Sequence, residues 1–219
     1  REAKTTATED LHEIFTAKAG ISSMDRHSIS DMAAHFDALR EYGKDCSLIY
    51  ELGVREIGSS WAFLTGLADR GTSMVTISDN RKKLEMSPIT ALISIDHVHP
   101  DKFGGEGTLA EFQKHAQENN VHHEFIEASS LDVNIENSHC IFFDTDHTYK
   151  QLSQELHLHG NKSKKYLLFH DTLGCAHEIV PAINEFLEEY PEWIVFDHSL
   201  ESQGMTSLAR MSVEQYNIM

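Results

Sequence analysis

The chain of 219 residues has few cysteines, few basic residues and no long apolar run. Its three cysteines, Cys46, Cys140 and Cys175, are odd in number and far apart, which fits neither a disulfide framework nor a zinc knuckle. We therefore expect reduced thiols and a cytoplasmic setting. No apolar run reaches the roughly 18–20 residues of a membrane span, and residues 1–10 are polar. The sequence thus predicts neither membrane insertion nor a signal peptide.

The shortage of basic residues makes the chain strongly acidic. It has 35 acidic residues against 18 basic ones, and a formal net charge of −17. Such a surface repels phosphate backbones, which argues against a nucleic-acid partner. The same field does not oppose a cationic ligand or a divalent metal ion, so the expected partner is a small molecule. Self-association into a homo-oligomer is left open.

Short apolar runs alternate with amphipathic segments along the chain, a pattern typical of an α/β protein. The predicted strands are 47–51, 91–96, 123–127, 140–144, 165–171, 193–197 and 205–210. The predicted helices are 8–20, 29–43, 58–69, 109–119, 149–159 and 179–189, and residues 73–78 are a candidate extra strand. We expect the last helix to begin around Pro181, whose missing N–H is harmless in a first turn.

This order predicts a doubly wound, mostly parallel, Rossmann-like sheet that ends in an antiparallel hairpin. Residues 1–45 are interpreted as a helical N-terminal extension and residues 46–219 as the Rossmann-like domain. In such sheets the ligand lies beyond the carboxyl ends of the strands. Four of the predicted strands end in an acid or in an imidazole and an acid, at Glu51, Asp96, Asp144 and His170-Asp171. That alignment predicts a functional site along one edge of the sheet.

A glycine turn follows the first predicted strand, where Glu51 to Ser60 read ELGVREIGSS. Gly53 permits a tight turn with positive φ and a close approach of the backbone to a ligand, and Gly58 lets the next helix pack against the strand. Glu51 could accept hydrogen bonds either from a ligand or from amides of the turn. The spacing is not G-x-G-x-x-G and no phosphate-binding lysine follows, which disfavours a dinucleotide fold and excludes a P-loop. An ordinary strand-to-helix turn is the alternative.

The turn and four later segments together resemble the class I methyltransferases that use S-adenosylmethionine (SAM), in the branch of the cephalosporin-hydroxylase-like and macrocin-type O-methyltransferase proteins. The matching segments are IYELGVREIGSSWAFL at 49–64, FFDTDHTY at 142–149, LLFHDT at 167–172, PAINEFL at 181–187 with Trp193, and GMTSLAR at 204–210. The resemblance runs from about residue 30 to residue 211. It implies a SAM-binding domain over residues 46–219, and it says little about the methyl acceptor.

The resemblance also implies a set of cofactor-binding positions along the strand ends. They are Glu51, Gly53, Arg55, Gly58, Ser59, Ser60, Asp96 and Ser129. An acid at Asp96 can pair with both hydroxyls of a ribose. At Ser129 this chain departs from the pattern, because many relatives carry an acid near the adenine there. A serine can still form a hydrogen bond with the edge of an adenine.

Metal-dependent members of the branch imply a second set of residues, with Asp144, His170 and Asp171 as metal ligands and His147 as the general base. His170 stands where those proteins have an acid, and two carboxylates with one imidazole would hold Mg²⁺ or Mn²⁺ weakly. Bound metal would lower the pKa of a substrate hydroxyl, and Asp144 and His147 are the catalytic candidates. The alternative is structural: Asp144 or Thr145 caps the next helix, and His170-Asp171 closes a strand end.

Three functions are compatible with these patterns. The first is a SAM-dependent methyltransferase acting on a hydroxyl of a small molecule, such as a sugar or a natural-product diol. The second is a domain that binds SAM or a nucleotide without turnover, as a partner or regulatory subunit. An NAD-dependent oxidoreductase is the third, and the missing G-x-G-x-x-G disfavours it.

Overall fold

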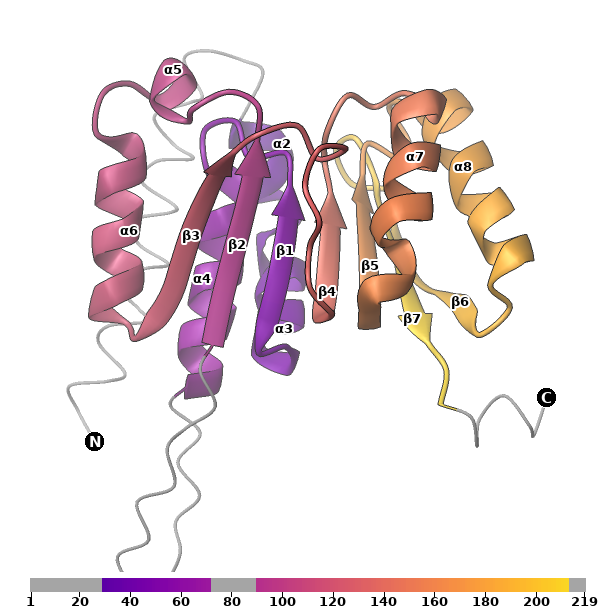
Figure 1. Ribbon diagram of the computed structural model, residues 1–219, viewed down its shortest axis with the longest axis horizontal. Coiled ribbons are helices and arrows are strands. Elements are labelled where there is room, and N and C mark those ends of the chain that lie inside the picture. The colour runs from indigo at the N-terminus through magenta and orange to yellow at the C-terminus, as the bar shows by residue number, and fades with distance from the viewer. Residues whose placement is uncertain (1–28, 72–89, 213–219) are drawn as a thin grey trace, which may run out of the picture.

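The computed structural model describes residues 29–71 and 90–212 (Figure 1). The predicted helix at 8–20 and the candidate strand at 73–78 lie outside the described residues. Its sheet has seven strands: β1 (Leu48–Leu52), β2 (Thr90–Asp96), β3 (Val121–Glu127), β4 (Ser138–Phe143), β5 (Ser163–His170), β6 (Trp193–Ser199) and β7 (Met205–Arg210). Each of the seven predicted strands is therefore present, with ends that differ by a few residues.

The strands lie in the order β3-β2-β1-β4-β5-β7-β6. Strands β1 to β5 are parallel, whereas β7 is antiparallel to both β5 and β6. The predicted mostly parallel sheet with an antiparallel C-terminal hairpin is thus confirmed. The order reverses between β1 and β4, which makes the carboxyl ends of these two strands the switch point where such sheets bind ligands. These ends point upwards in Figure 1.

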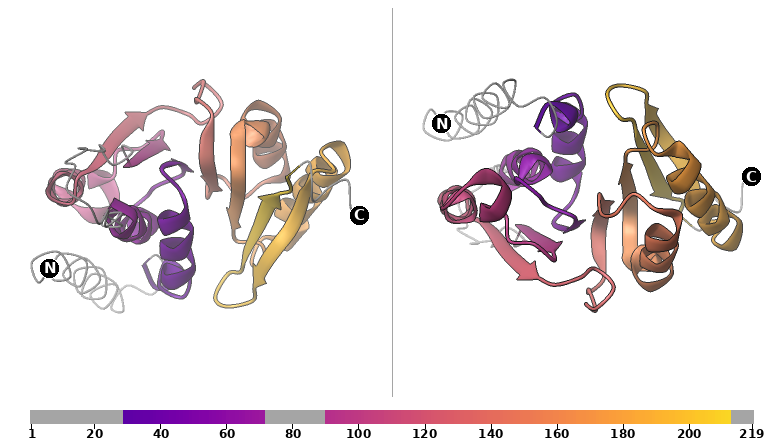
Figure 2. Two further views of the ribbon diagram at one scale, coloured as in Figure 1. Left: turned by 90° about the horizontal axis from the view of Figure 1, so that it is seen from below. Right: turned by 90° about the horizontal axis from the view of Figure 1, so that it is seen from above.

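Helices cover both faces of the sheet. They are α2 (Ile29–Ala33), α3 (Phe36–Asp45), α4 (Gly58–Gly71), α5 (Asp101–Gly104), α6 (Thr108–Glu118), α7 (Tyr149–His159) and α8 (Ala176–Glu189), with a 3₁₀ turn η2 (Gly160–Lys162). Helices α3, α4 and α6 bury one face and α7 and α8 the other, each side with its own apolar core (Figure 2). Within the described ranges we find no helix that is both long and apolar enough to cross a membrane.

The N-terminal helix predicted at 29–43 is instead two helices, α2 and α3. The chain turns at His35, whose amide donates a 3.0 Å hydrogen bond to the carbonyl of Met32. The turn buries His35 against the ring of His170, with 5.4 Å between the ring centroids. A tertiary contact therefore interrupts a pattern that is helical by its spacing. Helix α3 shares an apolar core with α4. The division of the chain into an extension over residues 1–45 and a domain over residues 46–219 stays a prediction.

The last helix begins earlier than predicted. Helix α8 starts at Ala176, which places Pro181 inside the helix rather than in its first turn. A proline there removes one intrahelical hydrogen bond. Burial of Ile179, Ile183 and Phe186 against the sheet stabilises the helix on both sides of the proline. Tertiary packing therefore outweighs the local preference.

Candidate functional site

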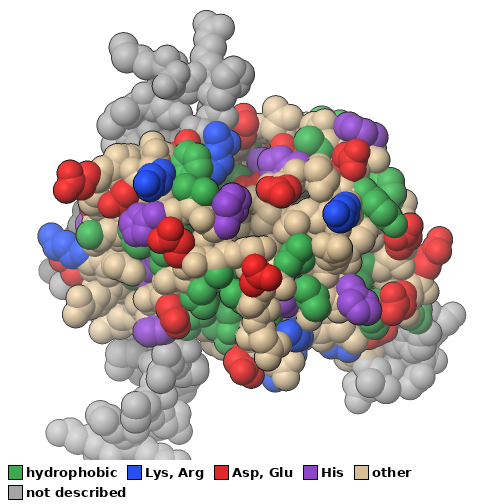
Figure 3. Space-filling model, turned by 45° about the horizontal axis from the view of Figure 1, so that its top comes forward, with side chains coloured by type: hydrophobic (Ala, Val, Ile, Leu, Met, Phe, Trp, Pro, Cys, Tyr) green, Lys and Arg blue, Asp and Glu red, His purple; other side chains and the backbone are tan. Residues whose placement is uncertain are grey.

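A cavity of about 650 Å³ opens at the carboxyl ends of the parallel strands, around the switch point between β1 and β4. Figure 3 shows the hollow at the top of the molecule, with histidine and acidic side chains around it. Most of the predicted site residues line this cavity: Gly53, Arg55, Gly58, Ser59, Asp96, Ser129, Asp144, His147, His170 and Asp171. Glu51 and Ser60 do not line it. The structure thus brings together ten residues that are spread over more than a hundred positions of the sequence.

The glycine turn brings two strand ends into direct contact. Gly53 has φ +88°, and a Cβ atom at this position would lie 2.0 Å from the carbonyl oxygen of Asp144. The glycine is therefore required by the close approach of the backbone after β1 to the backbone after β4. Arg55 and Ile57 in the same turn also have positive φ, which is uncommon for residues with a side chain. Non-glycine residues in this region of φ often mark functional sites.

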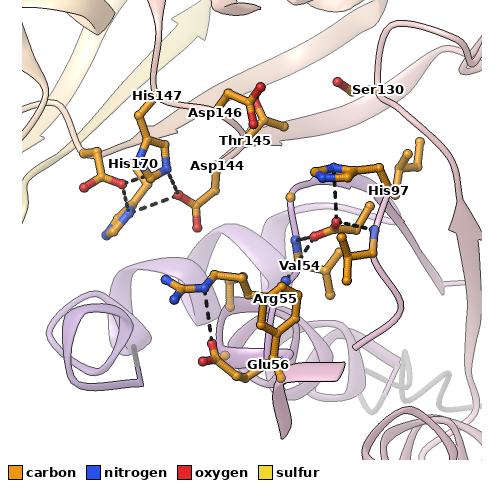
Figure 4. Close-up of a pocket in the computed structure, with 18 of the residues that line it drawn as sticks. Val54, Arg55, Glu56, His97, Ser130, Asp144, Thr145, Asp146, His147 and His170 are labelled. Atoms are coloured by element: carbon orange, nitrogen blue, oxygen red, sulfur yellow. Dashed lines mark hydrogen bonds and ion pairs between the residues drawn. The ribbon is translucent and has the colours of Figure 1, made fainter. Parts of the chain in front are cut away.

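Asp96, at the end of β2, orders the glycine turn. Its Oδ2 accepts hydrogen bonds from the amides of Val54 at 2.8 Å and Arg55 at 3.2 Å. Its Oδ1 accepts one from the amide of Val98 at 2.9 Å, and His97 lies 3.6 Å away (Figure 4). A carboxylate offers about four acceptor positions. Three are used by backbone amides, so Asp96 keeps about one position for a ligand, fewer than the two expected from the sequence.

Glu51 has a different role from the one expected. Its side chain is completely buried, and it accepts hydrogen bonds from the hydroxyls of Ser59 at 2.5 Å, Ser60 at 2.6 Å and Ser94 at 2.7 Å. The amides of the turn, one of the two kinds of donor that the sequence suggested for Glu51, bind Asp96 instead. Burial raises the pKa of Glu51 to about 7, although the three hydroxyl groups oppose the rise. Glu51 and Ser60 therefore hold α4 against β1 from behind the wall of the cavity.

Two histidines and two aspartates form a closed ring at the rim of the cavity (Figure 4). The Nε2 atom of His147 lies 3.1 Å from Asp144 and 3.0 Å from Asp171. The Nδ1 atom of His170 lies 3.2 Å from Asp144 and 2.9 Å from Asp171. His147 and Asp171 both have positive φ. Helix α7 is capped by Thr148, so the structure does not support Asp144 or Thr145 as its cap.

Charge pairing in the ring shifts its pKa values. Burial lowers the pKa of His170, but hydrogen bonds to Asp144 and Asp171 outweigh it and raise that pKa to about 10. Burial raises the pKa of Asp144, yet hydrogen bonds from both imidazoles bring it well below its ordinary value. The hydrogen bond to Asp144 raises the pKa of His147, which is one-third exposed at 36%. The carboxylates therefore favour the protonated form of both imidazoles.

The ring also contains a donor set that fits a divalent cation. One ligand atom each from Asp144, His170 and Asp171 lie within 4.8 Å of one another. Two carboxylate oxygens and one imidazole nitrogen suit Mn²⁺ or a softer ion better than Mg²⁺, which prefers oxygen ligands. The predicted ligand set is thus compatible with a divalent metal ion.

The far side of the cavity contains residues that sequence reasoning missed. Ser130 and Gln151 line it beside the predicted Ser129, and both form hydrogen bonds with the buried Glu155 of α7. A signal was present in the sequence. Glu155 and His159 share the face of α7 that carries Leu152 and Leu156, and a charged residue on an apolar stripe is rarely buried without a partner.

Comparison with known proteins finds similar structures but no similar sequences. No protein-family model and no curated protein sequence match the chain. A candidate caffeoyl-CoA O-methyltransferase from Staphylococcus aureus aligns with a TM-score of 0.55 and 14% identity, covering 90% of this chain and 98% of that one. The O-methyltransferase TomG from Streptomyces achromogenes, in complex with SAM, gives 0.53 and 15% over 97% and 91%.

A third solved structure extends the likeness to another source. The methyltransferase PaMTH1 from Podospora anserina, bound to S-adenosylhomocysteine (SAH), gives a TM-score of 0.52 and 12% identity over 97% of this chain and 89% of that one. At such low identities the likeness establishes the fold alone. The chain therefore has the Rossmann-like fold of these methyltransferases, as the resemblance of its sequence motifs implied.

Proposed function

We propose that this protein is a SAM-dependent methyltransferase that methylates a hydroxyl oxygen of a small molecule, such as a sugar or a natural-product diol. The observation that carries the proposal is the composition of the cavity at the switch point. It joins the glycine turn and Asp96, which suit an adenosine-containing cofactor, to the ring of His147, Asp144, His170 and Asp171, which suits proton transfer. The shared fold with SAM-bound and SAH-bound proteins supports the same assignment.

The cavity fits SAM in size and in charge. Its volume of about 650 Å³ lies within the usual range of small-molecule sites. Carboxylates on its wall match a cation such as a sulfonium. In the proposed arrangement the amino-acid end lies over the turn at Gly53, and one ribose hydroxyl takes the free acceptor position of Asp96. When bound, SAM supplies an electrophilic methyl group.

The ring supplies the groups that handle a proton. His147 is its most exposed member, and in its neutral form the imidazole accepts the proton that leaves the attacking hydroxyl. Asp144 and Asp171 orient the imidazole and stabilise the imidazolium that results, since both lie within 3.1 Å of its Nε2. The remaining task of the site is to align the oxygen with the methyl group.

A divalent metal is the second part of the proposal. Asp144, His170 and Asp171 would hold it, and it would lower the pKa of a chelated hydroxyl. His170 would then bind through Nδ1, the atom that faces both carboxylates. Removal of metal by EDTA should lower turnover, and Mn²⁺ or Mg²⁺ should restore it.

The proposal is tested with binding and turnover measured side by side. Calorimetry should detect SAM and SAH but not NAD, and a methyl-transfer screen against sugars and diols should give turnover. His147→Ala should keep its SAM affinity and lose about 10²–10⁴-fold in turnover, as expected for a missing general base. The matched control is His157→Ala, which removes an exposed histidine from α7, the helix that follows His147. A fully active His147→Ala enzyme would show that the ring is structural.

A domain that binds SAM without turnover is the second candidate. One observation favours it: the ring is closed by four contacts of 2.9–3.2 Å among its own side chains, in which one oxygen of Asp144 and one oxygen of Asp171 each contact both imidazoles. SAM binding with no methyl transfer to any acceptor, with or without added Mn²⁺, would support this candidate.

A further inference from the structure

A buried carboxylate lies behind the cavity wall, away from the ring. Glu155 of α7 has no exposed surface and does not line the cavity. It receives hydrogen bonds from Ser130 Oγ at 2.5 Å, Thr145 Oγ1 at 3.0 Å and Gln151 Nε2 at 3.0 Å. All three donors line the cavity. Figure 4 shows Ser130 on the opposite side of the cavity from His147.

The hydrogen bonds of Glu155 fix the polarity of these three groups. An ionised carboxylate only accepts, so the hydroxyl hydrogens of Ser130 and Thr145 both point inwards to it. The amide of Gln151 donates one hydrogen to Glu155 and the other to Ser130 Oγ, at 3.0 Å each. What the three groups have left are acceptors: lone pairs on both hydroxyl oxygens and on the carbonyl oxygen of Gln151. This part of the wall therefore favours a ligand group that donates hydrogen bonds.

The backbone under this wall is fixed as well. His159, one turn further along α7, is buried, and its Nε2 lies 2.7 Å from the carbonyl oxygen of Ser130. A carbonyl oxygen can only accept, so Nε2 carries the hydrogen. Burial lowers the pKa of His159, which favours this neutral form. Three side chains of α7 thus hold Ser130: Glu155 and Gln151 through its hydroxyl, and His159 through its backbone carbonyl.

We propose that Glu155 is a positioning residue that makes this end of the cavity select a base with an exocyclic amino group, and so an adenosine cofactor over its counterpart that carries hydrogen in place of the 6-amino group. The inference rests on the proposed function, which places the ribose at Asp96; the base then lies beyond Asp96, on the side of the cavity that Ser129 and Ser130 line. The amino group of adenine donates hydrogen bonds to this wall, whereas the C–H group that replaces it in the purine counterpart does not. The acceptors of the wall are then left without a partner, and buried polar groups without partners are strongly disfavoured.

The test compares SAH with its purine-riboside analogue, in which hydrogen replaces the 6-amino group of adenine and the rest of the base is unchanged. Calorimetry is run at pH 8, because burial raises the pKa of Glu155 and only its ionised form accepts all three hydrogen bonds. The wild-type protein should bind SAH at least about 100-fold more tightly than the purine-riboside analogue. Affinities within about threefold of each other would overturn the inference and leave the proposed function standing. If neither compound binds, the proposed function fails and the inference with it.

Variants then test whether Glu155 is the cause. In Glu155→Gln the new amide donates, so one hydroxyl must turn its hydrogen into the cavity, and the preference for SAH should fall below about tenfold. Glu51→Gln is the matched control, since Glu51 is equally buried and also accepts three hydrogen bonds, but from the other end of the site. Glu51→Gln should change the affinity for both compounds by the same factor, so that the ratio of the two affinities stays that of the wild type. An equal fall in both variants, or an unchanged ratio in Glu155→Gln, would overturn the role of Glu155.

A second variant covers the case in which Glu155→Gln does not fold, as judged by circular dichroism. Gln151→Met leaves Glu155 in place and removes both the donors to the network and the free carbonyl oxygen of Gln151. Gln151 is only half-buried, so this change is mild for folding. Its preference for SAH should also fall, by at least about threefold. A preference equal to that of the wild type would contradict the assignment.

Discussion

Replacing Glu51 with glutamine should change how the stability of the protein depends on pH. The carboxyl of Glu51 is completely buried, and burial raises its pKa from 4.5 to about 7 in the folded protein. A group with a raised pKa binds its proton more tightly when folded. Its contribution to stability is therefore complete below pH 4.5 and is lost as the pH rises through 7. Glutamine does not titrate, so the variant lacks this loss.

The size of the effect follows from the two pKa values. The gap between 4.5 and about 7 corresponds to about 3 kcal/mol, at about 1.4 kcal/mol for each pH unit. Most of this change, about 2.5 kcal/mol, falls between pH 5 and pH 8. Over that range the stability of the wild type should fall by this amount relative to Glu51→Gln. The histidines titrate in both proteins, so their contributions cancel in the difference.

The measurement is urea unfolding followed by circular dichroism at pH 5, 6, 7 and 8, with two-state behaviour checked at each pH. Glu118→Gln, which removes an exposed carboxylate of α6, controls for the loss of one negative charge from this acidic chain. The reasoning is refuted if the difference between wild type and Glu51→Gln stays constant within about 0.5 kcal/mol, which is less than a single hydrogen bond is expected to contribute.

Three further predictions concern the turn and the ring. Asp96→Ala should weaken SAH binding by about 10–100-fold, because it removes the acceptor that orders the glycine turn; calorimetry that shows full affinity would contradict this role. Gly53→Ala should lower the free energy of unfolding by about 2 kcal/mol or more, because its Cβ would lie 2.0 Å from the carbonyl oxygen of Asp144; an equal urea midpoint would show that this contact relaxes. Turnover should rise with pH, with a midpoint above the 6.5 of an ordinary histidine, because Asp144 raises the pKa of His147 and only the neutral imidazole accepts a proton; a flat profile of kcat would exclude His147 as the base.

Much of the fold could be predicted from the sequence because its signals are local. Alternation of apolar runs with amphipathic segments predicted the seven strands and the helices that separate them. Where it failed, a contact between distant residues decided the outcome. His35 turns towards His170 and divides one predicted helix into two. Packing against the sheet lets α8 begin at Ala176, five residues before Pro181.

The candidate site shows the same division. Acids at the ends of parallel strands must converge on one edge of the sheet, so the sequence by itself determined that Asp96, Asp144 and Asp171 would line a common cavity. Only the tertiary structure decided what each carboxylate binds. Whether an acid is buried, and which hydroxyls or amides reach it, depends on how helices pack against strands far away in the chain. For that reason Glu51 lies behind the wall. The apolar stripe of α7 indicated that Glu155 is buried, but only the packing of α7 showed that Ser130, Thr145 and Gln151 are its partners.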